Sequence, residues 1–245
     1  MQTQYNEIIN SFVDKYGLSR GQIIAEIEKT LSAMLSQWHG TSTVVLFGDD
    51  QLQALRYAEH PGMTLQNQLE LISARGWNTI VRVLDHNLGQ AACLHEVAHY
   101  KRREQEMRWG EIIRRNDDGF LVELEIEEGQ PILAECPWNR IGVHERKELS
   151  VGQKRAFHLR RIDPILLRGI ARVQVTVDRV SKNLVTTLLR EHLGGTTGIH
   201  VHCVKRYVGH KSFVAASGFL PKNIIKAVSQ ELREHIQVSV GEKKI

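Results

Sequence analysis

The sequence predicts a multidomain α+β protein, with a helical N-terminal domain at residues 1–108, a five-stranded β-barrel at residues 109–180 and a small α+β module at residues 181–245. Three observations predict this class. Apolar residues recur at helical spacing near the N-terminus, and five short runs with alternating apolar residues lie between residues 109 and 177. In residues 181–245, segments with helical spacing are interspersed with segments in which every second residue is apolar. A chain of 245 residues accommodates one large domain or two to three small ones.

The first 40 residues predict two packed helices. Residues 5–13 place their apolar side chains on one helical face, and Gly17 ends the segment. Ser19 then fits an N-cap, with Gln22 three residues later to complete a capping box. The next helix carries one apolar stripe, formed by Ile23, Ile24, Ile27, Leu31, Met34, Leu35 and Trp38. We expect this stripe to pack against the first helix.

Residues 41–108 show a less uniform pattern. Residues 43–47 predict a short strand, whereas residues 50–59 and 65–74 read as helical stretches separated by a break at Pro61 and Gly62. Residues 77–84 fit either a strand or a helix. Residues 88–107 predict a last helix, which ends in the charged run KRREQEMR and leads into the barrel.

Five strands are predicted for the barrel, because apolar residues alternate along short segments that turns separate. The predicted strands are WGEIIRR, GFLVELEI, QPILAEC, KRAFHLRRI and GIARVQVTV. Small barrels of this size, the oligonucleotide-binding (OB) fold among them, remove their sheet edges by closure and present an outer face to single-stranded nucleic acid. Nucleic-acid binding is therefore the first functional hypothesis.

Two aromatic residues of the barrel are candidates for stacking on bases, namely Phe120 and Trp138. Such stacking contributes about 1–3 kcal/mol per base. Phe120 stands in a period-two alternation and fits the barrel core equally well. Glutamates at residues 123–128 argue against a uniformly basic binding face. The candidates for contacts with the nucleic-acid backbone are Arg114, Arg115, Arg160 and Arg161.

The last module predicts the order helix, strand, strand, helix, strand, with helices at 181–192 and 221–233 and strands at 198–206, 211–217 and 235–240. Residues 181–245 carry ten Lys or Arg against four Asp or Glu, so the basic surplus of the chain lies here. A helix N-terminus offers free backbone N–H groups to phosphate. The predicted RNA contacts are Lys205, Arg206 and Lys211 around the strand turn, and Lys222, Asn223 and Lys226 at the last helix. A solvated basic surface is the alternative.

One sequence motif is typical of zinc peptidases. His95, Glu96 and His99 spell H-E-x-x-H in a predicted helix, where both His side chains share a face and the Glu can act as general base. The continuation YKRREQEMRW supplies neither a third His nor an obvious second helix with a ligand Glu. A polar helix face is therefore the alternative interpretation, and no metal or other cofactor is expected.

The composition places the protein in the cytoplasm. No apolar run approaches the roughly 20 residues that a membrane span needs, and the N-terminus lacks the pattern of a signal peptide. The three cysteines, Cys93, Cys136 and Cys203, lie far apart and form no C-x-x-C pair, so we expect reduced, structural thiols.

The order of these parts resembles the bacterial transcription elongation and antitermination factors of the NusA family, with a helical domain, an S1-type barrel and a KH-type module. The likeness rests on five segments, SRGQIIAEIEKTLSAML, RREQEMRWGEIIRRNDDGFLVEL, VTVDRVSKNLVTTLLREHL, GIHVHCVKRYVGHKSFVAAS and IIKAVSQELREHIQV. The resemblance implies a non-enzymatic protein that binds RNA polymerase through the helix at residues 19–38 and its neighbours. It also implies single-stranded RNA near Phe120, Arg206, Lys211 and Lys222.

The KH-type module departs from the family pattern. A KH module clamps nucleic acid with a G-x-x-G loop between two helices. Here the corresponding loop reads GFLPKN, and too few residues separate the preceding strand from Lys222 for another helix. A scaffold protein that kept the fold and lost RNA binding is therefore an alternative, beside the zinc peptidase.

Overall fold

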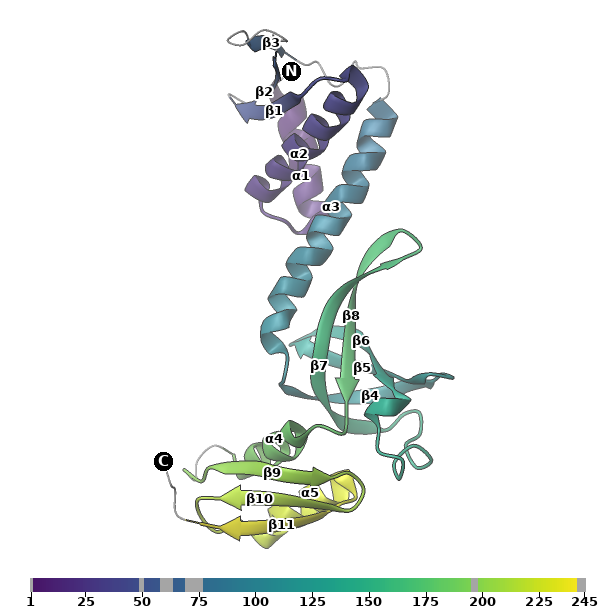
Figure 1. The fold of residues 1–245 in the computed structure, drawn as a ribbon, viewed down its shortest axis with the longest axis vertical. Helices are drawn as coiled ribbons and strands as arrows, with labels where there is room; N and C mark the ends of the chain where they lie inside the picture. The colour runs from purple at the N-terminus through teal and green to yellow at the C-terminus, as the bar shows by residue number, and fades with distance from the viewer. Residues whose placement is uncertain (1, 49–50, 58–63, 69–76, 195–197, 242–245) are drawn as a thin grey trace. The chain divides into compact units, whose positions relative to one another are not determined.

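The computed structural model describes residues 2–48, 51–57, 64–68, 77–194 and 198–241 (Figure 1). The chain divides into two compact units, Met1–Ala98 with Pro164–Val173, and His99–Asp163 with Gln174–Ile245. Helices and sheets occur in both, which confirms the α+β class. Across the described residues, no helix combines the length and the apolar character that crossing a membrane requires.

The first unit contains helices α1 (Gln2–Tyr16) and α2 (Arg20–His39), as predicted. Ser19 caps α2, and its capping box with Gln22 is present. The predicted apolar stripe of α2 is largely buried, with Ile23 at 0% and Leu31 at 1% exposure. It packs in one core with residues of α1 and of the long helix α3 (Trp77–Tyr100).

A three-stranded sheet corrects the helices predicted between residues 50 and 74. Strands β1 (Thr43–Gly48), β2 (Gln51–Tyr57) and β3 (Thr64–Gln68) pair in sequence order and antiparallel. The strand β2 forms because it pairs along its length with β1 and buries Leu52 and Ala54 on one face, so strand pairing overrides the helix-like local pattern. The predicted break at Pro61 and the end of the second predicted helix lie outside the described residues.

The helix predicted at residues 88–107 is also corrected at both ends. Helix α3 already begins at Trp77, so the ambiguous segment at residues 77–84 is helical. The helix ends at Tyr100, a single 3-10 turn follows over Lys101–Arg103, and Met107 already starts the first barrel strand.

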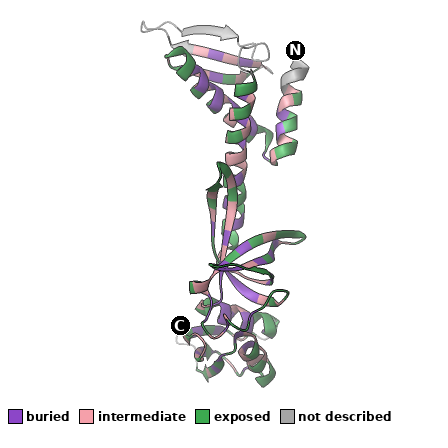
Figure 2. Cartoon of the chain, turned by 90° about the vertical axis from the view of Figure 1, so that its right-hand side faces the viewer, coloured by how far each residue is buried: buried purple, intermediate pink, exposed green. Residues whose placement is uncertain are grey.

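The five predicted barrel strands are present as β4 (Met107–Arg115), β5 (Gly119–Glu127), β6 (Gln130–Pro137), β7 (Lys154–Leu167) and β8 (Ile170–Asp178). They close in the order β4-β5-β6-β8-β7, where β7 returns to β4 antiparallel and β8 lies parallel to β6. Alternate residues such as Ile112, Val122 and Ala134 are fully buried, so they form the interior of the barrel (Figure 2). Strand β7 runs five residues beyond its predicted end at Ile162.

The C-terminal module follows the predicted order, with α4 (Lys182–Leu193), β9 (Val201–Tyr207), β10 (Lys211–Ala216), α5 (Lys222–Leu232) and β11 (His235–Val240). In its sheet, β10 lies between β9 and β11, antiparallel to the former and parallel to the latter (Figure 1). Leu188, Val228 and Val214 share one buried core, so both helices cover the same face of the sheet. Helix α5 begins at Lys222, one residue after the predicted start, and Pro221 is its N-cap.

A buried ion-pair cluster connects the barrel to this module, and apart from residues 164–173 of β7 and β8 both belong to one compact unit. The side chain of Arg179, just after β8, is 0% exposed. Its Nε donates to Glu145 at 3.0 Å and its Nη1 donates to Glu231 of α5 at 3.0 Å. The same Nη1 donates to the Ala156 carbonyl of β7 at 2.6 Å. We call Arg179, Glu145 and Glu231 the buried junction.

Candidate nucleic-acid interface

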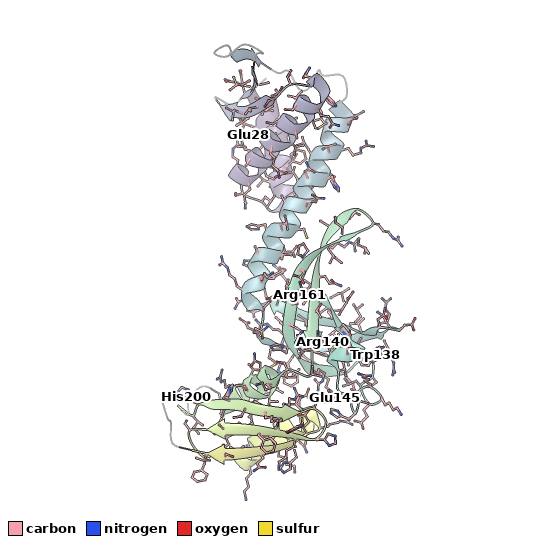
Figure 3. The ribbon with its side chains drawn as sticks, in the orientation of Figure 1. Glu28, Trp138, Arg140, Glu145, Arg161 and His200 are labelled. Carbon is pink, nitrogen blue, oxygen red and sulfur yellow. The ribbon has the colours of Figure 1, made fainter. Side chains whose placement is uncertain are left out.

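The barrel carries a groove of about 630 Å³ that is lined by three arginines and no carboxylate. One wall comes from β7, which contributes Arg160 and Arg161. Another comes from the end of β6 and the 3-10 turn Trp138–Arg140 that follows it. Its lining residues are Gln105, Pro137, Asn139, Arg140, Arg160, Arg161 and Thr176. We call this site the arginine groove, and Figure 3 labels Arg140 and Arg161 on it.

Two of the three groove guanidinium groups, those of Arg160 and Arg161, are paired with carboxylates and remain exposed. Arg160 is 42% exposed and donates to the buried Asp178 at 3.4 Å, and Arg161 is 72% exposed and pairs with Asp163. Arg140 forms no ion pair within the described part of the chain. Three cations therefore line an open groove, where exposed pairs of this kind exchange readily for phosphate oxygens.

The anchor of this arrangement is Asp178 at the end of β8. Burial works to raise the pKa of this carboxyl, but hydrogen bonds from His158, from the Ser181 amide and from Arg160 outweigh burial and hold the pKa below its ordinary value. The carboxyl is therefore ionised at neutral pH, and it fixes one edge of Arg160 while leaving the outer edge of the guanidinium to solvent.

Trp138 stands beside the groove and is partly exposed. Its Nε1 donates to the Asp117 carbonyl at 2.5 Å, and its ring meets Phe120 edge to face with centroids 4.9 Å apart. The exposed Arg115 places its guanidinium carbon 5.0 Å from the Trp138 ring centroid. Arg114 is exposed on the same strand. The structure thus brings Arg115 and Trp138 together, and Figure 3 labels Trp138 close to Arg140 of the groove.

Phe120 corrects the predicted pair of stacking rings. Its side chain is 2% exposed, because it points into the barrel in alternation with Val122 and Leu124. A base therefore has no access to the Phe120 ring. Phe120 instead packs against the Trp138 ring from inside the barrel. Phe120 is therefore a core residue, as the alternative interpretation of the sequence predicts.

A different part of the barrel surface is acidic. A second hollow, between β4, β5 and β6, is lined by Glu111, Glu123 and Glu125 against a single cation, Lys154. Phosphates are repelled there and attracted at the arginine groove. The barrel surface therefore carries one basic and one acidic region.

Arg206 corrects the predicted basic cluster of the C-terminal module. Its side chain is 1% exposed and pairs with the buried Glu234 at 2.8 Å. Burial works to raise the pKa of Glu234, but the Arg206 hydrogen bonds, the Gly209 amide and the Ser212 hydroxyl hold the pKa below its ordinary value. Arg206 therefore serves the fold and is not available to phosphate in this conformation.

The other predicted basic residues of this module lie on two separate surfaces. Lys205 and Lys211 stand on β9 and β10, whereas Lys222, Asn223 and Lys226 are exposed on α5. Between the end of β10 at Ala216 and the start of α5 the described chain contains no helix, so a loop between two helices is not formed there.

The H-E-x-x-H residues do not form a metal site within the described residues. His95 and Glu96 are exposed on α3, and His99 Nε2 lies 2.6 Å from Glu127 Oε1. No group of three or more His, Cys, Asp or Glu that could hold a metal ion occurs in the part of the chain that the structure describes. The three-ligand site that this zincin motif needs is therefore not assembled from these residues.

Sequence reasoning missed Arg140, which lines the groove from the turn after β6. A signal was present, because this arginine closes the tripeptide WNR directly after a strand, where an aromatic and a cation adjoin. It also missed the buried junction, whose partners are far apart in sequence and carry no local pattern.

No protein-family model matches this chain. A search of curated proteins found no relative that meets the criterion for similarity.

Proposed function

We propose that this protein is a NusA-like, non-enzymatic protein that binds single-stranded RNA and RNA polymerase and so modulates transcription elongation or termination. The arginine groove is the observation that carries the proposal. Three accessible guanidinium groups line one surface of a small closed barrel, and carboxylates are absent from that lining. This arrangement suits a polyanion of modest width.

The topology supports the same proposal. A five-stranded closed barrel with a parallel pairing between its third and fifth strands resembles the Greek-key barrel of the OB fold, of which the S1 type is one. The following α-β-β-α-β module, with its mixed sheet, resembles a KH module without the clamp loop. Helical, barrel and KH-like parts in this order are what the family resemblance implies.

The geometry of the groove indicates how RNA would lie. The arginines at the groove would each pair with a phosphate oxygen, and Trp138 with Arg115 above it would offer a stack to an adjoining base. The strand would avoid the glutamates between β4 and β6. Contacts of this kind position the backbone and read little sequence.

Salt-dependent binding tests the proposal. We expect a fluorescein-labelled oligo(U) RNA to bind in fluorescence anisotropy, and three phosphate contacts alone predict an affinity loss of about 20-fold between about 50 and 200 mM salt. Replacing all three groove arginines by Gln should reduce the salt slope by about 2. A matched control replaces Lys29, Arg82 and Lys147, which are also exposed, by Gln and makes the same change in net charge.

Two outcomes decide between the proposal and its alternative. If the groove variant and the control variant lose the same RNA affinity, the groove is not the RNA-binding site. If the protein retains RNA polymerase in a pull-down but shows no salt-dependent affinity for RNA, the scaffold protein is favoured. If it binds neither RNA polymerase nor RNA, the proposal is wrong.

A further inference from the structure

A second surface, on the C-terminal module, combines aromatic rings with lysines. Helices α4 and α5 cover one face of the β9–β10–β11 sheet, and the other face is turned to solvent. Tyr207 and Phe213 stand on this outer face with ring centroids 6.2 Å apart and ring planes at 74°. Tyr207 is 46% exposed although it is large and partly apolar. Water-exposed rings of this kind mark an interaction surface when they gather.

The lysines and rings form a regular array across two strands. Lys205 pairs in register with Phe213, and Lys211 pairs with Tyr207, so rings and cations alternate in both directions. The Lys205 ammonium lies 4.7 Å from the Tyr207 ring centroid, and that of Lys211 lies 5.1 Å from the Phe213 centroid. We call these four residues the ring-and-lysine face.

The charge around the array has one sign. The outward positions of β9, β10 and β11 carry Lys and His and no Asp or Glu among the described residues. The buried carboxylate of Glu234 in the same module is already paired with Arg206. A partner of this face therefore brings negative charge together with flat apolar groups.

We propose that the ring-and-lysine face is a second nucleic-acid site, on which bases of a single strand stack while the lysines contact the flanking phosphates. Stacking on rings displayed by a sheet, next to cations, is how sheet surfaces hold single-stranded nucleic acid. A run of Asp and Glu residues would also meet the lysines, but its side chains supply no planar apolar rings to stack on Tyr207 and Phe213. The site goes beyond the arginine groove, because it uses other residues and other chemistry.

The first arm of the test measures affinity. Anisotropy with a labelled oligo(U) RNA of about 12 nucleotides compares the protein with Tyr207→Leu/Phe213→Leu and with Lys205→Gln/Lys211→Gln. We expect the ring variant to bind at least about 5-fold more weakly, and the lysine variant to lower the salt slope by about 1.4. The matched control is Phe219→Leu, which removes a ring that is 86% exposed in the loop before α5.

The second arm locates the contact. Ultraviolet cross-linking of a 5-bromouridine oligonucleotide, followed by peptide mass spectrometry, should label the peptides that contain Tyr207 or Phe213. Leucine at both positions keeps apolar volume, and circular dichroism confirms folding of each variant. Cross-links confined to the barrel, or an equal loss in Phe219→Leu, would overturn the site.

Failure of this site and failure of the proposed function are distinguishable. If only the groove variant weakens RNA, the ring-and-lysine face is wrong and the proposed function stands. If only the ring and lysine variants weaken it, the second site stands and the groove is wrong. A different outcome is that a poly-glutamate peptide competes fully with oligo(U) and binds the Tyr207→Leu/Phe213→Leu variant as tightly as the unchanged protein. That result would assign the face to acidic proteins and overturn the proposal.

Discussion

Replacing Arg179 by Met should destabilise the unit that holds the barrel and the C-terminal module by about 3–5 kcal/mol. The magnitude follows from what the guanidinium leaves behind. Glu145 is 2% exposed, and the side-chain hydrogen bonds that its carboxylate accepts come from Arg179. Glu231 keeps hydrogen-bond donors in the Arg179→Met variant, because Arg155 and the Ala156 amide still donate to its carboxylate. The cost is therefore dominated by one uncompensated buried charge.

Urea unfolding followed by circular dichroism measures this free energy, and hydrogen exchange of peptides from β7 and α5 localises it. A loss of 3–5 kcal/mol corresponds to exchange that is roughly 10²- to 10³-fold faster or more. As a matched control, Arg103→Met removes a partly exposed pair with Glu106, at 3.6 Å, and should cost at most about 1 kcal/mol.

A double variant separates charge burial from packing. Arg179→Met with Glu145→Met removes both charges and keeps apolar volume, so it should be more stable than Arg179→Met alone. If the two substitutions instead add their costs, the argument from an uncompensated carboxylate is refuted. A loss in Arg179→Met no larger than in Arg103→Met would refute it equally.

Three further predictions concern other parts of the fold. Gly119→Ala should destabilise the barrel by about 1–3 kcal/mol or more in urea unfolding, because a Cβ there would lie 2.2 Å from the Cys136 carbonyl oxygen. The pKa of Glu234 is below its ordinary value near 4.5, so the stability it contributes is present above that pH and is lost as the pH falls below it. Unfolding midpoints measured from neutral to acid pH should show this loss, and Glu234→Gln should reduce the dependence on pH. Ser19→Ala removes the N-cap of α2 and should lower the free energy of unfolding of the first unit by about 1 kcal/mol, whereas Ser19→Asp should retain it.

Helices and strands that form from a local sequence pattern were predicted correctly. Alternation of apolar residues located all five barrel strands, and the cap at Ser19 with the left-handed glycine at Gly17 located the boundary between α1 and α2. Strand β2 escaped prediction because its local sequence, QLQALRY, also fits a helical pattern, and its strand conformation comes from antiparallel pairing with β1.

Site residues were harder to predict than elements, because a charged side chain has the same letter whether it is exposed or paired. Arg206 and Arg161 both lie in basic stretches, yet the first is 1% exposed beside Glu234 and the second is 72% exposed at the groove. What separates them is a carboxylate 28 residues away in sequence for Arg206. Such long-range pairing leaves no local periodicity to detect.

The buried junction also bears on avidity. Because Arg179 ties the barrel exit to Glu231 of α5, the arginine groove and the ring-and-lysine face belong to one compact body and not to two tethered ones. A strand already held at one surface would meet the other at a high effective concentration, with gains of about 10²- to 10⁴-fold when it is long enough to reach both. Affinity should therefore rise abruptly at a threshold length of RNA. Loosening the junction should make that rise gradual while leaving the affinity of short oligonucleotides unchanged.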